Sequence, residues 1–256
     1  MHLRKTLLHL TLFMAGLMLL QPGLFAQGRG GRGGGAAPAQ TPKAAAPFDL
    51  TGYWVSIITE DWRYRMVVPA PGDYQGVPMT PEARKIAESW DIAKETASGD
   101  PCKSYGAPAL LRAPGRLHIT WQDDQTLKMD ADAGTQTRMF HFAGWKPAGG
   151  PPSWQGDSIA EWERGGGRGA TDGSLKVTTT NLKSGFLRKN GVPYSENANL
   201  MEYFDLIKEP NGDPLMVVTI ITTDPMYLRQ PFVITSQFKK QASDSGWKPS
   251  ACSAKW

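Results

Sequence analysis

The chain has 256 residues and a formal net charge of +4. Five basic residues precede Asp49, the first acidic residue, so the part of the chain that begins there carries a net charge of −1. A nearly neutral domain lacks the basic surface that nucleic-acid binding requires, and we therefore expect no nucleic-acid partner.

The first 26 residues have the three-part pattern of a secretory signal peptide. Arg4 and Lys5 form a positive start, residues 7–20 form an apolar run, and Pro22 and Gly23 break that run before Ala26. The run is shorter than the roughly 20 residues of a membrane span, so we expect cleavage after Ala26 rather than a retained anchor helix. The sequence thus predicts a periplasmic or secreted protein with no stable membrane insertion.

Residues 27–47 are mostly Gly, Ala, Pro and Arg and contain nothing that can build a core. This composition predicts a disordered linker. The linker includes a G-x-G-x-x-G pattern from Gly28 to Gly33, but the pattern follows no predicted strand and opens no helix, so it does not indicate a nucleotide site. Residues 48–256 remain as one folded domain.

Short runs rich in β-branched and aromatic residues, separated by Gly, Pro and Asp, indicate that this domain is all-β. In the clearest run, residues 116–122, Leu117, Ile119 and Trp121 share one face, and two turns connect this run to the next two strands in a meander. The other strands are expected at residues 51–58, 62–68, 157–164, 174–182, 198–206, 215–222 and 232–239. About ten strands closing into a single antiparallel barrel would leave no exposed edge; a two-sheet sandwich is the alternative.

One amphipathic helix is predicted among the strands. Thr80 is suited to be its N-cap, Pro81 its first residue and Glu82 an acid in its first turn, and Gly99 is placed to end it. The apolar stripe of such a helix must pack on the sheet. The helix is either a plug over one end of the barrel or a lid over a cavity.

The two cysteines, Cys102 and Cys252, predict one disulfide, because an even pair in an oxidising compartment most simply pairs. Pairing also removes the soft ligands that a zinc site would need, and the chain has no H-E-x-x-H motif. We therefore expect neither a metal nor another cofactor.

Four ionisable side chains on predicted strands are candidates for catalysis. His118 and His141 can act as a general base or as a ligand for a small molecule. Glu161 and Glu202 are candidate acids, and Glu202 lies between apolar neighbours, where burial would raise its pKa. We predict that His118 and Glu202 face the barrel interior; a structural or solvent-exposed role is the alternative for each of the four.

Aromatic side chains are the other expected part of a binding site. Those on or near the predicted strands that we expect to contact a ligand are Trp54, Trp121, Trp162 and Tyr203. Aromatic residues also pack in the cores of β domains, which is the alternative for this set.

The chain also carries a series of spaced motifs. Residues 152–163 read P-S-W-Q-G-D-S-I-A-E-W-E, residues 173–180 read G-S-L-K-V-T-T-T, and a G-x-P-x-S turn begins at Gly191. With the L-T-G-Y-W run at Leu50 and the M-T-P-E run at Met79, they resemble a large family of secreted bacterial proteins of unknown function. The resemblance implies a lipocalin-like barrel and no established site residues. Many members have His where this chain has Asp157, so Asp157 is not expected to be a fixed catalytic group.

Three functions are compatible with these features. The first is an exported protein that binds a small, largely apolar molecule inside its barrel. The second is an enzyme of the hydratase, cyclase or hydrolase type, acting on a lipid-like or sugar substrate through the ionisable candidates. The third is a non-catalytic interaction module of the cell envelope with a filled barrel. A cavity above about 300 Å³ would favour the first two; the sequence leaves open both the enzymatic activity and the oligomeric state.

Overall fold

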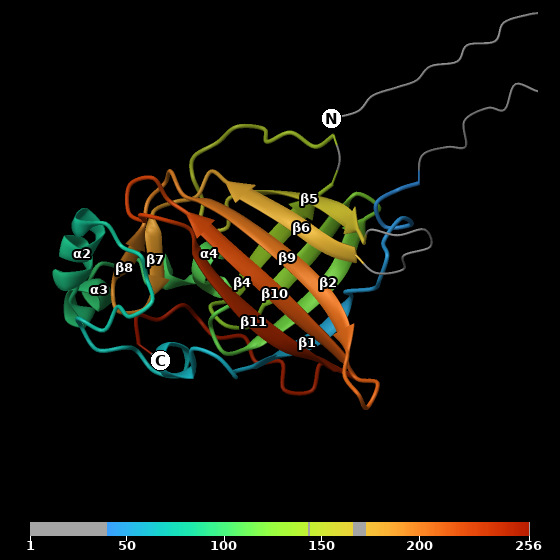
Figure 1. Ribbon diagram of the computed structural model, residues 1–256, viewed down its shortest axis with the longest axis horizontal. Coiled ribbons are helices and arrows are strands. Elements are labelled where there is room, and N and C mark those ends of the chain that lie inside the picture. Colours follow the sequence, from blue (N-terminus) through green and yellow to red (C-terminus); the bar gives the residue numbers. More distant parts are fainter. Residues whose placement is uncertain (1–39, 143, 166–172, 256) are drawn as a thin grey trace, which may run out of the picture. The chain divides into compact units, whose positions relative to one another are not determined.

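The structure, a computed structural model, describes residues 40–142, 144–165 and 173–255. Within these residues nine strands close into a barrel (Figure 1), rather than forming a two-sheet sandwich. In their order round the barrel the strands are β1 (Gly52–Ile57), β11 (Phe232–Gln241), β10 (Pro214–Thr223), β9 (Asn199–Lys208), β6 (Gly173–Thr180), β5 (Asp157–Arg164), β4 (Gln136–His141), β3 (Thr126–Ala131) and β2 (Arg116–Asp123). Strand β2 pairs with β1 and completes the ring.

The sheet is mixed, because β4 and β5 run parallel and pair over only Phe140 with Ser158 and His141 with Ile159. All other neighbouring strands of the ring are antiparallel. The prediction of an all-β barrel is confirmed, whereas the expectation that all its strands run antiparallel is wrong. The segment from β4 to β5 is too long for a hairpin and crosses over, so β5 starts beside the end of β4.

The predicted strand at residues 62–68 is also wrong. Its first half is a short helix, α1 (Trp62–Arg65), which follows Asp61 in the left-handed region at φ 52°. The Arg65 side chain points inward, where its Nε donates to the Arg112 carbonyl over 3.0 Å. The tertiary contacts of Arg65 thus outweigh the β-strand preference of its aromatic neighbours Trp62 and Tyr64.

The predicted single helix is two helices, α2 (Pro81–Glu88) and α3 (Ile92–Ala97). Thr80 caps α2 as expected, accepting a hydrogen bond from the Ala83 amide over 3.2 Å, but Asp91 caps a new helix by accepting from Lys94 over 2.8 Å. Asp is favoured at N-caps over helix interiors, so the predicted helix is interrupted at Asp91 and a second helix begins after it. The remaining helical turns are η1 (Lys103–Tyr105) and α4 (Ala107–Leu110).

Helix α2 packs on a separate two-stranded sheet of β7 (Gly185–Arg188) and β8 (Val192–Tyr194) at one end of the barrel (Figure 1). Trp90, just after α2, lies against Gly191 in the turn between these strands. Gly191 has φ +83°, and a Cβ there would lie 2.3 Å from Trp90. Only glycine allows this close approach.

The barrel interior is filled with side chains. Large residues from strands all round the ring have no solvent exposure, among them Trp54, Met129, Phe140, Phe204 and Met216. A side chain with no exposed surface borders no space that water can enter, so these residues form a packed core. The alternation of β2 places Leu117 and Ile119 in this core, which is the usual arrangement of apolar residues inward.

The disulfide between Cys102 and Cys252 is confirmed. The two Cα atoms lie 5.0 Å apart, and the bond joins positions 150 residues apart in the sequence. It ties the loop after α3 to the C-terminal tail, which also contacts the turn after β3, where the Ser250 amide donates to the Asp132 carbonyl over 2.9 Å.

The folded domain begins before Phe48, although residues 40–47 belong to the predicted linker. Residues 42–45 form a turn beside β5, where Trp162 Nε1 donates to the Pro42 carbonyl over 2.8 Å and Arg164 Nη2 to the Ala45 carbonyl over 3.1 Å. The Phe48 ring meets Trp162 edge-on at 5.4 Å. The predicted signal peptide and residues 27–39 lie outside the described residues. In the described part of the chain, no helix is both long and apolar enough to cross a bilayer.

Candidate functional site

A cleft of about 440 Å³ lies where β4 and β5 part, and we call it the β4–β5 cleft. Since the two strands pair only at the end of β4, the earlier part of β4 has no neighbour on that side. The crossover segment between the strands folds over this gap and provides the second wall. The cleft is lined by Gln136, Thr137, Met139, His141, Trp145, Ser153, Trp154, Gln155, Gly156, Asp157 and Ser158.

A chain of buried polar groups connects the floor of the cleft to the barrel core. The Ser158 hydroxyl lies 2.8 Å from that of Thr179, which accepts from Arg138 Nη2 over 3.1 Å. Arg138 in turn donates to both carboxylate oxygens of Glu202, over 2.8 and 2.6 Å. Both members of this ion pair are fully buried. The floor is therefore held in place by a hydrogen-bonded network from four strands.

Two tryptophans and two amides form the upper part of the cleft. Trp145 stacks on His141 at 4.0 Å between ring centroids, and the Lys183 amine lies 4.3 Å above the Trp154 ring. Gln155 Nε2 donates to Gln136 Oε1 over 2.9 Å and to the Tyr105 carbonyl over 2.8 Å. These two bonds orient the Gln155 amide and leave its buried Oε1 without a hydrogen-bond partner among the described residues.

His141 and Asp157 are the titratable groups of the cleft. Burial lowers the pKa of His141, and the charges of Asp123 and Asp157 oppose that effect in part. The imidazole is therefore neutral at neutral pH and can both donate and accept a hydrogen bond. The Asp157 carboxylate accepts from Asn181 Nδ2 over 3.0 Å, which holds it at the edge of the cleft.

The four ionisable candidates lie in different places. Only His141 lines the cleft. His118 does not face the interior: it stacks on Tyr53 at 4.0 Å on the outer face of the barrel. Glu202 does face the interior, but its ion pair with Arg138 satisfies it there. Glu161 is exposed and pairs with Lys176 over 2.9 Å.

The aromatic candidates do not gather at one site. Trp54 is fully buried in the core, where its Nε1 donates to the Leu50 carbonyl over 2.8 Å. Trp121 and Trp162 both pack against Phe142, each at 5.5 Å between ring centroids. The Tyr203 hydroxyl contacts the Met201 sulfur at 3.0 Å. None of these side chains lines the β4–β5 cleft.

Sequence reasoning missed Trp145, Trp154 and Gln155 as site residues. All three lie in the crossover segment, and the last two belong to the P-S-W-Q-G-D-S run that carries the family resemblance. The available signal was a cluster of Trp and Gly in a long connection, since long ordered loops are often functional.

Within the described residues, no three His, Cys, Asp or Glu side chains gather in a way that suits a metal ion. No family model, no curated protein and no solved structure matches the chain. The resemblance to secreted bacterial proteins therefore stays a prediction from the motifs.

Proposed function

We propose that this is an exported binding protein whose β4–β5 cleft holds a small ring-shaped molecule with apolar faces and polar edges, such as a sugar. The observation that carries the proposal is a 440 Å³ cleft whose lining combines the tryptophans Trp145 and Trp154 with the polar side chains of His141 and Asp157. Ligand sites in proteins commonly measure about 300–1,000 Å³ and combine aromatic walls with a few polar anchors.

This proposal moves the ligand from the barrel interior to its outer face. The interior residues border no free space, so a ligand there would have to displace core side chains. The cleft, in contrast, needs no such rearrangement. The His141 imidazole and the Asp157 carboxylate line the cleft, and a purely apolar ligand would cover them without forming hydrogen bonds, which is why a partly polar ligand fits better. The Cys102–Cys252 disulfide is compatible with export.

The test is a calorimetric titration of the purified chain with a panel of mono- and disaccharides, and with apolar aromatic compounds of similar size. We expect a saturable signal for at least one sugar, and a loss of affinity of tenfold or more in Trp145→Ala and Trp154→Ala. Trp62→Ala is the matched control, because Trp62 is 63% exposed and lies outside the cleft. Sugar binding that survives both cleft substitutions, or no binding by any panel member, would refute the proposal.

An enzyme acting in the same cleft is the second candidate, because His141 and Asp157 both line it. A neutral His141 can serve as general base, with Asp157 as a second acid or base. Ser158 also lines the cleft, but its hydroxyl contacts Thr179 over 2.8 Å, and β-strand alternation directs it away from His141, so we do not assign it as a nucleophile activated by His141. Mass spectrometry of ligands found by calorimetry tests this: turnover that His141→Gln abolishes without loss of binding would establish catalysis, and unchanged ligand would exclude it.

A further inference from the structure

The Cys102–Cys252 disulfide lies within one side chain of the β4–β5 cleft. Gln136, at the start of β4, lines the cleft and donates from Nε2 to the Cys252 sulfur over 3.4 Å and to the Gly134 carbonyl over 2.7 Å. The Oε1 atom of the same amide accepts the hydrogen bond from Gln155 Nε2 over 2.9 Å. One side-chain amide therefore connects a sulfur of the disulfide with the wall of the cleft.

The other cysteine anchors a second support of this wall. Cys102 precedes the helical turn η1, and its carbonyl accepts from the Tyr105 amide over 2.8 Å. The Tyr105 carbonyl accepts from Gln155 Nε2 over 2.8 Å, and the Ala107 amide donates to the Trp154 carbonyl over 2.9 Å. The wall is thus held by the η1 segment as well as by β4, and the disulfide fastens these two supports together through the tail.

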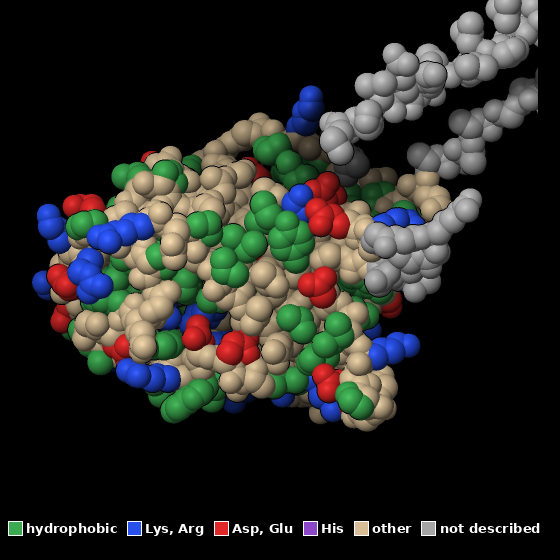
Figure 2. All heavy atoms as spheres, viewed as in Figure 1, with side chains coloured by type: hydrophobic (Ala, Val, Ile, Leu, Met, Phe, Trp, Pro, Cys, Tyr) green, Lys and Arg blue, Asp and Glu red, His purple; other side chains and the backbone are tan. Residues whose placement is uncertain are grey.

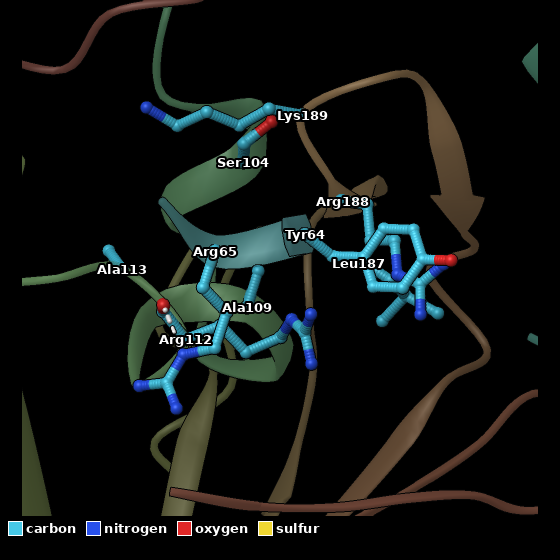
Figure 3. A pocket seen from close by; sticks show the side chains of 9 residues that line it. All are labelled: Tyr64, Arg65, Ser104, Ala109, Arg112, Ala113, Leu187, Arg188 and Lys189. Atoms are coloured by element: carbon cyan, nitrogen blue, oxygen red, sulfur yellow. Dashed lines mark hydrogen bonds between the residues drawn. The ribbon is translucent and has the colours of Figure 1, made fainter. Parts of the chain in front are cut away.

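Hydrogen bonds also hold the tail on either side of the disulfide. Thr135 Oγ1 donates to the Ser250 carbonyl over 2.9 Å. The Lys189 side chain points away from the arginines drawn in Figure 3, and its amine donates to the Tyr105 hydroxyl over 2.9 Å and to the Lys255 carbonyl over 3.5 Å. Because each such bond contributes only modestly, the covalent bond is the strongest constraint on the position of the tail.

The disulfide can be reached by a reductant from the solvent. Both cysteines are only partly buried, and solvent-exposed disulfides exchange with thiols more readily than buried ones. A dithiol reduces the bond when one of its thiolates attacks a cysteine sulfur, and its second thiolate then resolves the mixed disulfide. The protein gains two electrons and two protons as two cysteine thiols, and the reductant leaves as a disulfide.

We propose that the Cys102–Cys252 disulfide is a redox-sensitive control of ligand binding in the β4–β5 cleft. The oxidised form keeps Trp154 and Gln155 in place, and reduction by a dithiol loosens both and weakens binding. Gln136 is the positioning residue through which Cys252 acts on the wall. A loosened wall must be ordered again when a ligand binds, and that ordering lowers the affinity. The effect on affinity rests on the proposed function, whereas the loosening of the wall does not.

Hydrogen–deuterium exchange of the full chain, with and without dithiothreitol, tests the loosening in the absence of any ligand. We expect the Ala107 amide, whose acceptor is the Trp154 carbonyl, to exchange about tenfold faster or more after reduction. The Leu228 amide, which donates to the Asp224 carbonyl over 3.0 Å outside the cleft, controls for a general loss of stability. Equal acceleration at both amides, or none at Ala107, would overturn the proposal.

Calorimetry with maltose and methyl glucoside in both redox states tests the effect on binding. Reduction should weaken binding about fivefold or more in the wild type and in Gln122→Ala, the control at an exposed position of β2. Gln136→Ala keeps the disulfide but removes its contact with the wall, so reduction should change its affinity less. Equal affinity of the two wild-type forms, or an equal response in Gln136→Ala, would overturn the proposal. No sugar binding by the oxidised wild type would refute the proposed function instead, and the exchange at Ala107 would still decide the response of the wall.

Discussion

Arg138 on β4 and Glu202 on β9 form a fully buried ion pair across the barrel, joined by two hydrogen bonds of 2.8 and 2.6 Å. The same arginine reaches Thr179, whose hydroxyl contacts Ser158 in the floor of the β4–β5 cleft. A single core arginine thus connects the barrel interior with the candidate binding site. This arrangement makes Glu202 a structural partner rather than a free acid.

Glu202→Ala should destabilise the protein by about 3–5 kcal/mol, because it leaves Arg138 buried without its counter-charge. Replacing both residues with apolar ones, as in Arg138→Met with Glu202→Leu, should cost less than the single change. Urea unfolding measures the free energies. Glu161→Gln is the control, since its solvent-exposed pair with Lys176 should contribute little to stability. A Glu202→Ala loss no larger than that of the control would contradict the structural role.

Cys252→Ser should lower the free energy of unfolding by about 2–5 kcal/mol. The bond closes a loop between positions 150 residues apart, and cross-linking so long a loop removes much entropy from the unfolded chain. Thermal and urea unfolding of the oxidised wild type and of the variant measure this loss. Because Cys102→Ser breaks the same bond, it should give the same loss, and a clear difference between the two would show that a lone thiol has its own effect.

The pH dependence of stability should contain a contribution from His141. Burial lowers its pKa in the folded state, so the unfolded chain binds the proton more readily. This contribution is present above the ordinary histidine pKa of about 6.5 and is lost as the pH falls towards the lower folded-state value. Unfolding free energies between about pH 5 and pH 8 should therefore fall less steeply on the acid side in His141→Gln. Parallel curves for the two proteins would contradict this assignment.

His118→Ala should loosen the C-terminal tail without affecting ligand binding. The His118 ring stacks on Tyr53 and meets Trp247 of the tail edge-on at 6.2 Å between centroids. Losing these aromatic contacts should cost about 0.5–1.5 kcal/mol, measured by urea unfolding. Calorimetry with the ligand of the β4–β5 cleft gives the second measurement, in which His141→Ala should lose affinity and His118→Ala should not. Weaker binding in His118→Ala would return this residue to the list of site candidates.

The exposed surface on the face seen in Figure 2 mixes acidic, basic and hydrophobic side chains, with no large area of a single charge. This pattern agrees with the near-neutral charge of the chain from Asp49 onward. A buried cation such as Arg138 is indicated neither by a view of the surface nor by the net charge.

The sequence by itself determined the features that depend on neighbouring residues. Alternation identified β2 and its two faces, Thr80 and Pro81 marked the start of α2, and the cysteine count identified the Cys102–Cys252 bond. The strand and helix signals are local, because they depend only on residues close in the sequence. The disulfide could be predicted because two cysteines allow only one pairing. Alternation does not say which face of a strand points inward, however. The structure places the apolar Leu117 and Ile119 in the core, so the prediction that His118 faces the interior is wrong.

Only the tertiary structure decided which distant residues meet. The parallel pairing of β4 with β5 depends on the path of the crossover, and that pairing alone opens the cleft beside His141. The partner of Glu202, Arg138, is 64 residues away in the sequence. A charge acquires its role from its partners and its burial, and both are set by the packing of the whole barrel rather than by its neighbours in the chain.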